Sequence, residues 1–154
     1  TNAGTLALEN SHSITGSFIQ TSDGVLDIGI AGTSLGDYGH LDISSAASLA
    51  GGLGLHLFGG FTLAEGQTFD LLNFASSTGD FTSLSLNGIA CSSGGVDDWS
   101  CSNMNGYIDL KLSYAGSGSE LDLVVGHQVP EPASLGLFAT ALAALGLIRR
   151  RKAA

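Results

Sequence analysis

Short elements in which apolar and polar residues alternate recur along most of this chain. In Val25–Ile30, the residues Leu26, Ile28 and Ile30 share one face and Asp27 lies on the other, as in a β-strand with one buried face. Turn-forming residues separate the elements, and the strong helix formers lysine, glutamate and arginine are scarce. The sequence therefore predicts an all-β domain, with strands within Leu6–Leu8, Ile14–Ile19, Val25–Ile30, Leu41–Ile43, Leu53–Leu57, Phe69–Leu72, Phe81–Leu86, Ile108–Leu112 and Leu121–Val125.

The recurrence of these elements indicates how they stack. They begin at residues 25, 41, 53, 69 and 81, as expected for β-coils that each bury their apolar residues against the next coil. Residues 16–81 contain the motifs Gln20-x-x-x-Gly24-x-Leu26-x-Ile28, Gly39-His40-Leu41-x-Ile43 and Gly66-x-x-Phe69-x-Leu71-Leu72-x-Phe74. With these motifs the segment resembles the terminal coils of autotransporter-type β-helix passengers, and the resemblance implies a right-handed parallel β-helix or a closely related solenoid. An antiparallel β-sandwich is the alternative architecture for this many short strands.

The C-terminal part of the chain has a different composition. Val129-Pro130-Glu131-Pro132 precedes an uncharged stretch, Ala133–Ile148, and Arg149-Arg150-Arg151-Lys152 follows it. A helix of that length spans roughly 24 Å, a little short of a hydrocarbon core of roughly 30 Å, and snorkelling arginines compensate for the difference. We therefore predict a β-rich domain over residues 1–128 and a terminal segment over 129–154, with a transmembrane helix at 133–148. Basic residues stay cytoplasmic, so everything before Pro130 is expected outside the inner membrane, in the periplasm.

Pro-Glu-Pro, a short apolar helix and a terminal arginine cluster resemble, in this order and spacing, the PEP-CTERM sorting signal of Gram-negative bacteria. The resemblance implies that exosortase, a membrane protease-transpeptidase, recognises Pro130-Glu131-Pro132 and removes the helix and the basic tail. The rest then passes to the cell surface or extracellular matrix. An ordinary membrane anchor with a proline-rich hinge is the alternative. Because no secretory leader lies at Thr1, we expect a mature form or a C-terminal fragment of an exported protein.

Two cysteines and a pair of acids define one local feature. An exported address favours a disulfide between Cys91 and Cys101, which would contribute about 2–3 kcal/mol through loop closure. A metal site is disfavoured there, since the loop has no CxxC motif and no histidine. Asp97 and Asp98 are weak candidates for calcium binding, and no other cofactor is expected. The histidines do not cluster in the sequence and are predicted to be surface or turn residues: His12, His40, His56 and His127.

The charge distribution restricts the class of partner. Thirteen acidic residues precede Pro130 and only one basic residue, Lys111, accompanies them, so we exclude nucleic acid as a partner. Exosortase, the inner membrane before processing, and exopolysaccharide or other matrix proteins remain. We therefore expect a non-enzymatic structural or adhesive surface protein.

Two other functions compete with this interpretation. The first is a polysaccharide-active enzyme that uses paired carboxylates such as Asp27 and Asp42 on successive coils. The second is a carbohydrate-binding module that uses Trp99 and loop acids, although aromatic residues that merely cover the edges of the coils are the better expectation. Gly32-Thr33-Ser34-Leu35-Gly36 matches G-x-S-x-G but lacks the helix that a nucleophile elbow requires, so it predicts a turn.

Overall fold

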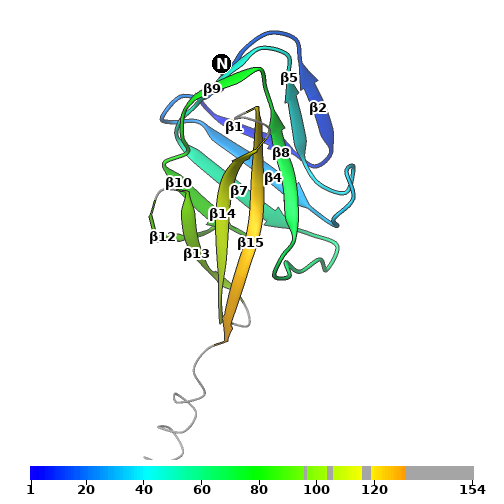
Figure 1. Cartoon of the computed structure of the whole chain (residues 1–154), viewed down its shortest axis with the longest axis vertical. Coiled ribbons are helices and arrows are strands. Elements are labelled where there is room, and N and C mark those ends of the chain that lie inside the picture. Colours follow the sequence, from blue (N-terminus) through cyan, green and yellow to red (C-terminus); the bar gives the residue numbers. More distant parts are fainter. Residues whose placement is uncertain (96, 104–105, 116–118, 131–154) are drawn as a thin grey trace, which may run out of the picture.

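The computed structural model describes residues 1–95, 97–103, 106–115 and 119–130, and its regular secondary structure there consists of β-strands (Figure 1). The all-β prediction is confirmed for this part of the chain. The strands are β1 (Thr5–Leu8), β2 (Ser11–Ile14), β3 (Phe18–Ile19), β4 (Val25–Ile30), β5 (His40–Ile43), β6 (Ala46–Leu49), β7 (Gly52–Leu57), β8 (Thr68–Asn73), β9 (Ser76–Gly79), β10 (Ser83–Leu86), β11 (Ile89–Ala90), β12 (Ser92–Ser93), β13 (Asp98–Asn103), β14 (Gly106–Ala115) and β15 (Glu120–Pro130).

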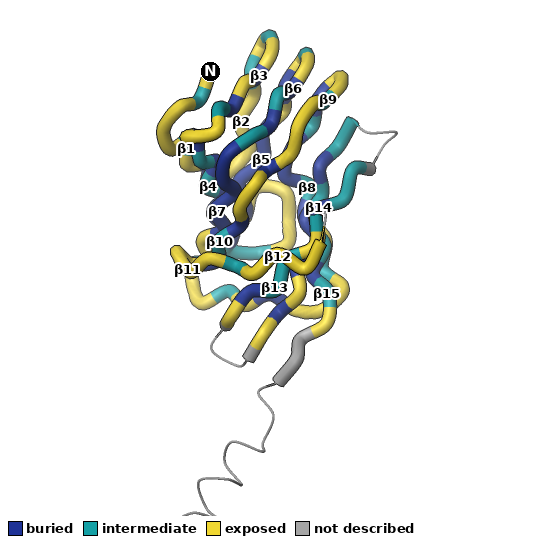
Figure 2. The backbone as a smooth tube through the Cα atoms, turned by 90° about the vertical axis from the view of Figure 1, so that its left-hand side faces the viewer, coloured by how far each residue is buried: buried dark blue, intermediate teal, exposed yellow. Residues whose placement is uncertain are grey.

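The first ten strands, here called the parallel part, visit three sheets in turn (Figure 2). β1, β4, β7 and β10 pair in parallel in the first sheet, β2, β5 and β8 in the second, and β3, β6 and β9 in the third. One passage through the three sheets is a rung. Successive rungs keep their register, so that Leu6, Leu26, Leu53 and Leu84 form one column across the first sheet. Of these four leucines, the last three are almost completely buried.

The last five strands, here called the antiparallel part, pair differently. β11 closes the first sheet against β10, and β12, β13, β14 and β15 form an antiparallel meander. β15 also pairs antiparallel with β8, which joins the meander to the second sheet in the order β12-β13-β14-β15-β8-β5-β2. Parallel pairing, expected for stacked coils, and antiparallel pairing, expected for a sandwich, are therefore both present, in mixed sheets.

The sequence elements correspond to strands, but their relation to the rungs was predicted incorrectly. Val25–Ile30 is β4 with the predicted bounds, and its pairing partner is Gly52–Leu57, two elements further on. The intervening element, Leu41–Ile43, lies in another sheet. One rung thus contains two of the recognised elements and a third, serine- and alanine-rich strand such as Ala46–Leu49, which the apolar pattern missed. Strand β2 begins at Ser11, before the predicted element Ile14–Ile19.

Two glycines of the recognised motifs are explained by close approach between rungs. A Cβ at Gly39 would overlap the carbonyl oxygen of Leu8 in the rung beside it. A Cβ at Gly24 would lie 2.6 Å from the carbonyl oxygen of Asn2 and 2.7 Å from Cγ of Gln20. Only glycine lacks the atom that would clash, so both positions require it.

A single hydrophobic core fills the space between the sheets of both parts. Leu41, Leu72 and Leu121 stand in register on the core side of the second sheet, and each is at most 1% exposed. Burying an aliphatic side chain of this size contributes about 1.5–3 kcal/mol. Within the described ranges no helix is long and apolar enough to cross a membrane. The predicted helix at 133–148 and the basic residues Arg149, Arg150, Arg151 and Lys152 lie outside those ranges.

Candidate functional site

The sorting motif predicted from the sequence begins at the end of the longest strand. β15 carries Val129 and Pro130 as its last residues, and Pro130 pairs with Gly106 at the end of the β14–β15 ladder. Because proline has no amide hydrogen to donate, the last position of a ladder accommodates it. β15 is hydrogen-bonded to β14 on one side and to β8 on the other, and it ends at the lower tip of the described part in Figure 1. Glu131 and Pro132 lie outside the described residues.

The predicted disulfide is confirmed. Cys91 and Cys101 are bonded with an S–S distance of 2.02 Å, and the bridge ties the end of β11 to the middle of β13. Asp97 and Asp98, the calcium candidates, lie within the loop it closes. Burial raises the pKa of Asp97, and the charges of Asp80 and Asp98 raise it further. The described residues contain no group of three or more histidine, cysteine or acidic side chains placed to hold a metal ion.

The carboxylate pair considered for catalysis is not brought together. Asp27 lies on β4 in the first sheet, whereas Asp42 lies on β5 in the second. The reason is the rung length, since residues 15 or so apart occupy different sheets of the same rung. Ser34, the centre of the G-x-S-x-G match, is exposed in the loop between these two strands. Neither arrangement provides the geometry that the corresponding chemistry needs.

The aromatic residues considered for sugar binding mostly belong to the core. Trp99 is in register with Leu110, which is 1% exposed, so the indole lies on the core side of its sheet. Trp99 and Tyr114 pack against the core, and Tyr38 is 5% exposed. Tyr107, at 52% exposed, is the large aromatic of the described residues that faces solvent. Trp99 is therefore partly buried against the core, and it also lines a groove on β13, β14 and β15.

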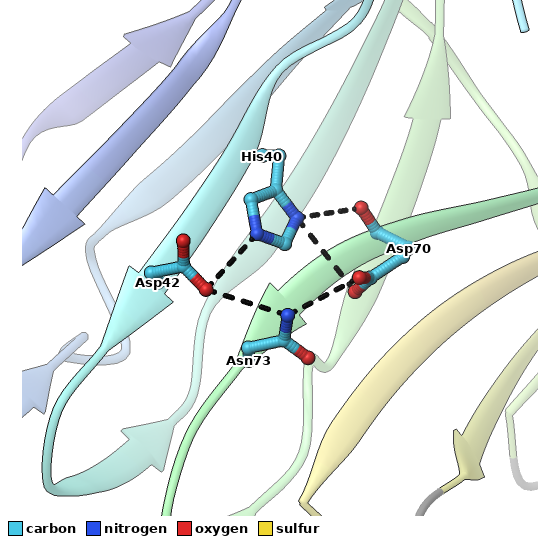
Figure 3. Close-up of polar contacts among 4 residues, drawn as sticks. All are labelled: His40, Asp42, Asp70 and Asn73. Atoms are coloured by element: carbon cyan, nitrogen blue, oxygen red, sulfur yellow. Dashed lines mark hydrogen bonds and ion pairs between the residues drawn. The ribbon is translucent and has the colours of Figure 1, made fainter. Parts of the chain in front are cut away.

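His40 is buried among polar groups instead of lying at the surface as predicted (Figure 3). Its Nδ1 lies 2.9 Å from the backbone carbonyl oxygen of Asp70 and 3.7 Å from Oδ1 of the same residue. Its Nε2 lies 3.2 Å from Oδ1 of Asp42. The Asn73 amide completes the cluster by donating to Asp42 at 3.3 Å and to Asp70 at 3.2 Å.

A bulge in β8 explains why His40 fits there. Leu121 pairs with Leu72 but the next residue, Asp122, pairs with Asp70, so β8 has one extra residue at Leu71. The β5–β8 ladder is correspondingly reduced to two pairs that begin at Leu41. The position before Leu41 has no partner in this ladder, and there the imidazole of His40 bonds the carbonyl oxygen of Asp70. In a regular ladder a backbone amide would satisfy that carbonyl.

The chemistry of this cluster follows from its surplus of acceptors. Both ring nitrogens of His40 face oxygen atoms that accept hydrogen bonds, the carbonyl of Asp70 and the carboxylate of Asp42. The cluster therefore fixes the orientation of the Asp42 carboxylate from two sides, through His40 and Asn73. Asp42 itself remains 58% exposed. The oxygen atoms Oδ1 of Asp70 and Oδ1 of Asn73 are buried without a hydrogen-bond partner.

Two shallow grooves lie on the second sheet. The rung groove, about 420 Å³, crosses β2, β5, β8 and the start of β15, and Ser13, Ile14, Asp42, Ser44, Asn73 and Glu120 line it. The hairpin groove, also about 420 Å³, lies on β13, β14 and β15, and Asp98, Asp109, Lys111, Gly126 and His127 contribute to it. In the hairpin groove the charged groups are partly paired, Lys111 with Asp98 at 4.0 Å and His127 with Glu65 at 3.2 Å.

Sequence reasoning missed the His40 cluster and the rung groove. The Gly39-His40-Leu41-x-Ile43 motif indicated only the fold, and apart from Asp42 on the same strand the neighbours of His40 come from β8 in another rung. The available signal was Asp42 between Leu41 and Ile43 and Asp70 between Phe69 and Leu71, because a polar residue between apolar ones in a strand faces outward.

Comparison with known families identifies the C-terminal segment. The PEP-CTERM protein-sorting motif matches residues 128–152, which include Pro130-Glu131-Pro132 and the basic residues through Lys152. The motif indicates a surface protein sorted by exosortase, made as a membrane-anchored precursor and then exported to the cell surface. It does not extend to residues 16–81, for which the resemblance to autotransporter passengers stays a prediction. No curated protein matches the chain.

Proposed function

We propose that this protein is a non-enzymatic structural or adhesive component of the cell surface or extracellular matrix, which exosortase delivers from the inner membrane. The observation that carries the proposal is the sorting motif at residues 128–152, directly continuous with the last strand of the β-rich domain. In the proposed precursor, residues 133–148 span the inner membrane, Arg149–Lys152 stay cytoplasmic and residues 1–128 form a domain in the periplasm. Cleavage at Pro130-Glu131-Pro132 then releases or re-attaches that domain.

The architecture is part of the proposal. We interpret the parallel part as a short right-handed β-helix, or a closely related solenoid, onto which the antiparallel part is built. The regular return of the chain to the same sheet after every third strand supports this. A stack of this kind buries a continuous column of aliphatic residues and suits a load-bearing or space-filling role better than a single enzymatic cleft.

The non-enzymatic part of the proposal is supported by the separation of the candidate catalytic groups. Asp27 and Asp42 belong to different sheets, and Ser34 lies in an exposed loop without a following helix. A polysaccharide-active enzyme remains the competing function. Release of reducing ends from soluble polysaccharides by the purified protein would support the enzyme and count against a purely structural role.

The sorting step is tested by Glu131→Ala. If exosortase recognises the Pro-Glu-Pro element, the variant stays in the inner membrane as the full-length chain, whereas the unchanged protein reaches the surface. Fractionation of inner membrane, surface and medium followed by immunoblotting gives the measurement. Glu9→Ala is the matched control, because it removes an exposed glutamate far from the motif in the sequence. Release of Glu131→Ala at the normal level contradicts the proposal.

A further inference from the structure

The rung groove contains a row of polar side chains that the register of four strands brings together. Ser13 on β2 pairs with Asp42 on β5, Asp42 with Asn73 on β8, and Asn73 with Glu120 on β15. These residues come from four different strands, and the row crosses them perpendicular to the chain direction. The groove volume of about 420 Å³ falls within the roughly 300–1,000 Å³ of small-molecule sites.

We propose that this groove binds an uncharged, hydroxyl-rich segment of a glycan. The inference rests on the proposed function, in which the domain works among extracellular polysaccharide, and it assigns the ligand class and the site. Sugar hydroxyls donate hydrogen bonds to the carboxylates of Asp42 and Glu120 at the centre and at one end of the row. The hydroxyls of Ser13 and Ser44 exchange hydrogen bonds with the sugar at the other end, and the partly buried Ile14 offers an apolar contact.

Preorganisation distinguishes this row from ordinary exposed acids. The Asp42 carboxylate is held by His40 at 3.2 Å and by Asn73 at 3.3 Å, yet 58% of the side chain is exposed. A carboxylate whose rotamer is already fixed loses less conformational entropy when it accepts a ligand hydroxyl. Ser44 is fixed as well, because its Oγ accepts a hydrogen bond from the backbone N–H of Gly16 at 2.9 Å.

The composition of the groove excludes other ligand classes. Among the described residues no lysine or arginine lines it, so the charged groups that phosphate, sulfate or uronate would meet there are carboxylates. Within the described part of the chain no group of three or more histidine, cysteine or acidic side chains is placed to hold a metal ion, which disfavours a divalent cation as the ligand. The hairpin groove is the weaker candidate, because Lys111 already pairs with Asp98 and His127 with Glu65.

Titration calorimetry on the whole chain tests the inference. The protein is purified in a polyoxyethylene detergent, which has no sugar headgroup to compete, and titrated at pH 7 with cellohexaose, dextran oligomers, an oligogalacturonate, a chitosan oligomer and calcium chloride. We expect binding of at least one uncharged oligosaccharide, weakened tenfold or more by Glu120→Ala and severalfold by Ser13→Ala. Asp109→Ala removes one exposed carboxylate from the other groove of the same sheet and serves as the control with equal charge change.

Each outcome decides the inference. Unchanged affinity in Asp109→Ala together with losses in Glu120→Ala and Ser13→Ala supports it. Equal losses in all three variants, binding only of chitosan or calcium, or no binding of any uncharged oligosaccharide overturns it. Circular dichroism of each variant shows that it is folded. If Glu131→Ala stays in the inner membrane as expected but the unchanged protein binds no glycan, this inference is overturned and the proposed sorting is left intact.

Discussion

The parallel part and the antiparallel part of this molecule are stabilised in different ways. In the parallel part, strands pair with strands one full rung away, and only β8 and β10 also pair with strands of the antiparallel part. In the antiparallel part, β13, β14 and β15 pair with their immediate neighbours in the sequence, and the Cys91–Cys101 disulfide adds a covalent link. The comparison teaches that one core is assembled from long-range pairing on one side and from local pairing on the other.

Strand pairing, hydrogen bonds and a shared core connect the two parts. β15 pairs with β8 over five residue pairs, and Leu121 meets Leu72 there. The Tyr114 hydroxyl donates a hydrogen bond of 2.6 Å to the Asp80 carboxylate, which lies between β9 and β10. Burial raises the pKa of Tyr114, and the hydrogen bond to Asp80 raises it further, so the phenol remains protonated and able to donate at all ordinary pH values. The sorting motif thus follows a strand that is bonded to both parts.

The largest expected effect comes from removing the disulfide, which lies within the antiparallel part, and it tests whether the two parts unfold separately. Replacing both Cys91 and Cys101 by serine removes the loop closure that restricts the unfolded chain, so we expect the free energy of unfolding to fall by about 2–3 kcal/mol. The loss should appear first in the antiparallel part. Hydrogen exchange followed by mass spectrometry measures it, with faster exchange expected in β13 and β14 than in β4 and β7. Uniformly faster exchange in both parts would show that they unfold as one unit.

The second effect addresses the parallel part alone. The buried Gln20 amide donates to the carbonyl oxygens of Ala50 at 2.7 Å, Gly52 at 2.9 Å and Gly24 at 3.3 Å, joining neighbouring rungs. Gln20→Met keeps the side-chain length but removes these three hydrogen bonds, so we expect a loss of about 1–2 kcal/mol.

Denaturant unfolding measures this loss, and Gln67→Met is the matched control. Gln67 makes a hydrogen bond of 2.8 Å to the nearby Ala64 amide at the surface, so its replacement should change stability by less than about 0.5 kcal/mol. Equal losses in the two variants would mean that Gln20 does not join the rungs.

For the parallel part, the sequence predicted where the strands lie better than which strands pair with one another. Alternation identified Val25–Ile30 with its bounds because three isoleucines and leucines stand on one face. It missed Ala46–Leu49 and Ser76–Gly79, since serine, alanine and glycine give no apolar pattern and these strands exist because the stack pairs them. The disulfide was predictable from two cysteines in an exported chain, because no other pairing existed.

The rung groove was beyond sequence reasoning for a physical reason. Its residues meet only through register, and register depends on the rung length and on the bulge at Leu71. The sequence paired Asp42 with Asp27, whereas the structure pairs it with Asn73. The burial of His40 follows from the same bulge, which no local pattern reveals.

The smallest expected effect concerns the seam where the two parts meet. Asp122 on β15 pairs directly with Asp70 on β8, and like charges at such a position destabilise a sheet by about 0.2–1 kcal/mol. Burial raises the pKa of Asp122, and the charges of Asp70 and Glu120 raise it further. A carboxyl whose pKa is raised in the folded state contributes its stability below the pKa of the unfolded chain, near 3.9, and loses it as pH rises through the folded value.

At pH 7 the repulsion between the charges of Asp122 and Asp70 therefore destabilises the unchanged protein fully, and Asp122→Asn should remove this repulsion. We expect the melting temperature of the variant to be higher at pH 7 and the difference to shrink as pH falls below about 4, where both forms are neutral at this position. Thermal unfolding of the two proteins at pH 7, 5 and 3.5 measures the trend. Asp109→Asn is the control, since its partner across the ladder is Ser100 and no like-charge pair is removed. A variant that is less stable than the unchanged protein at pH 7 would show that Asp122 holds the two parts together instead of straining their junction.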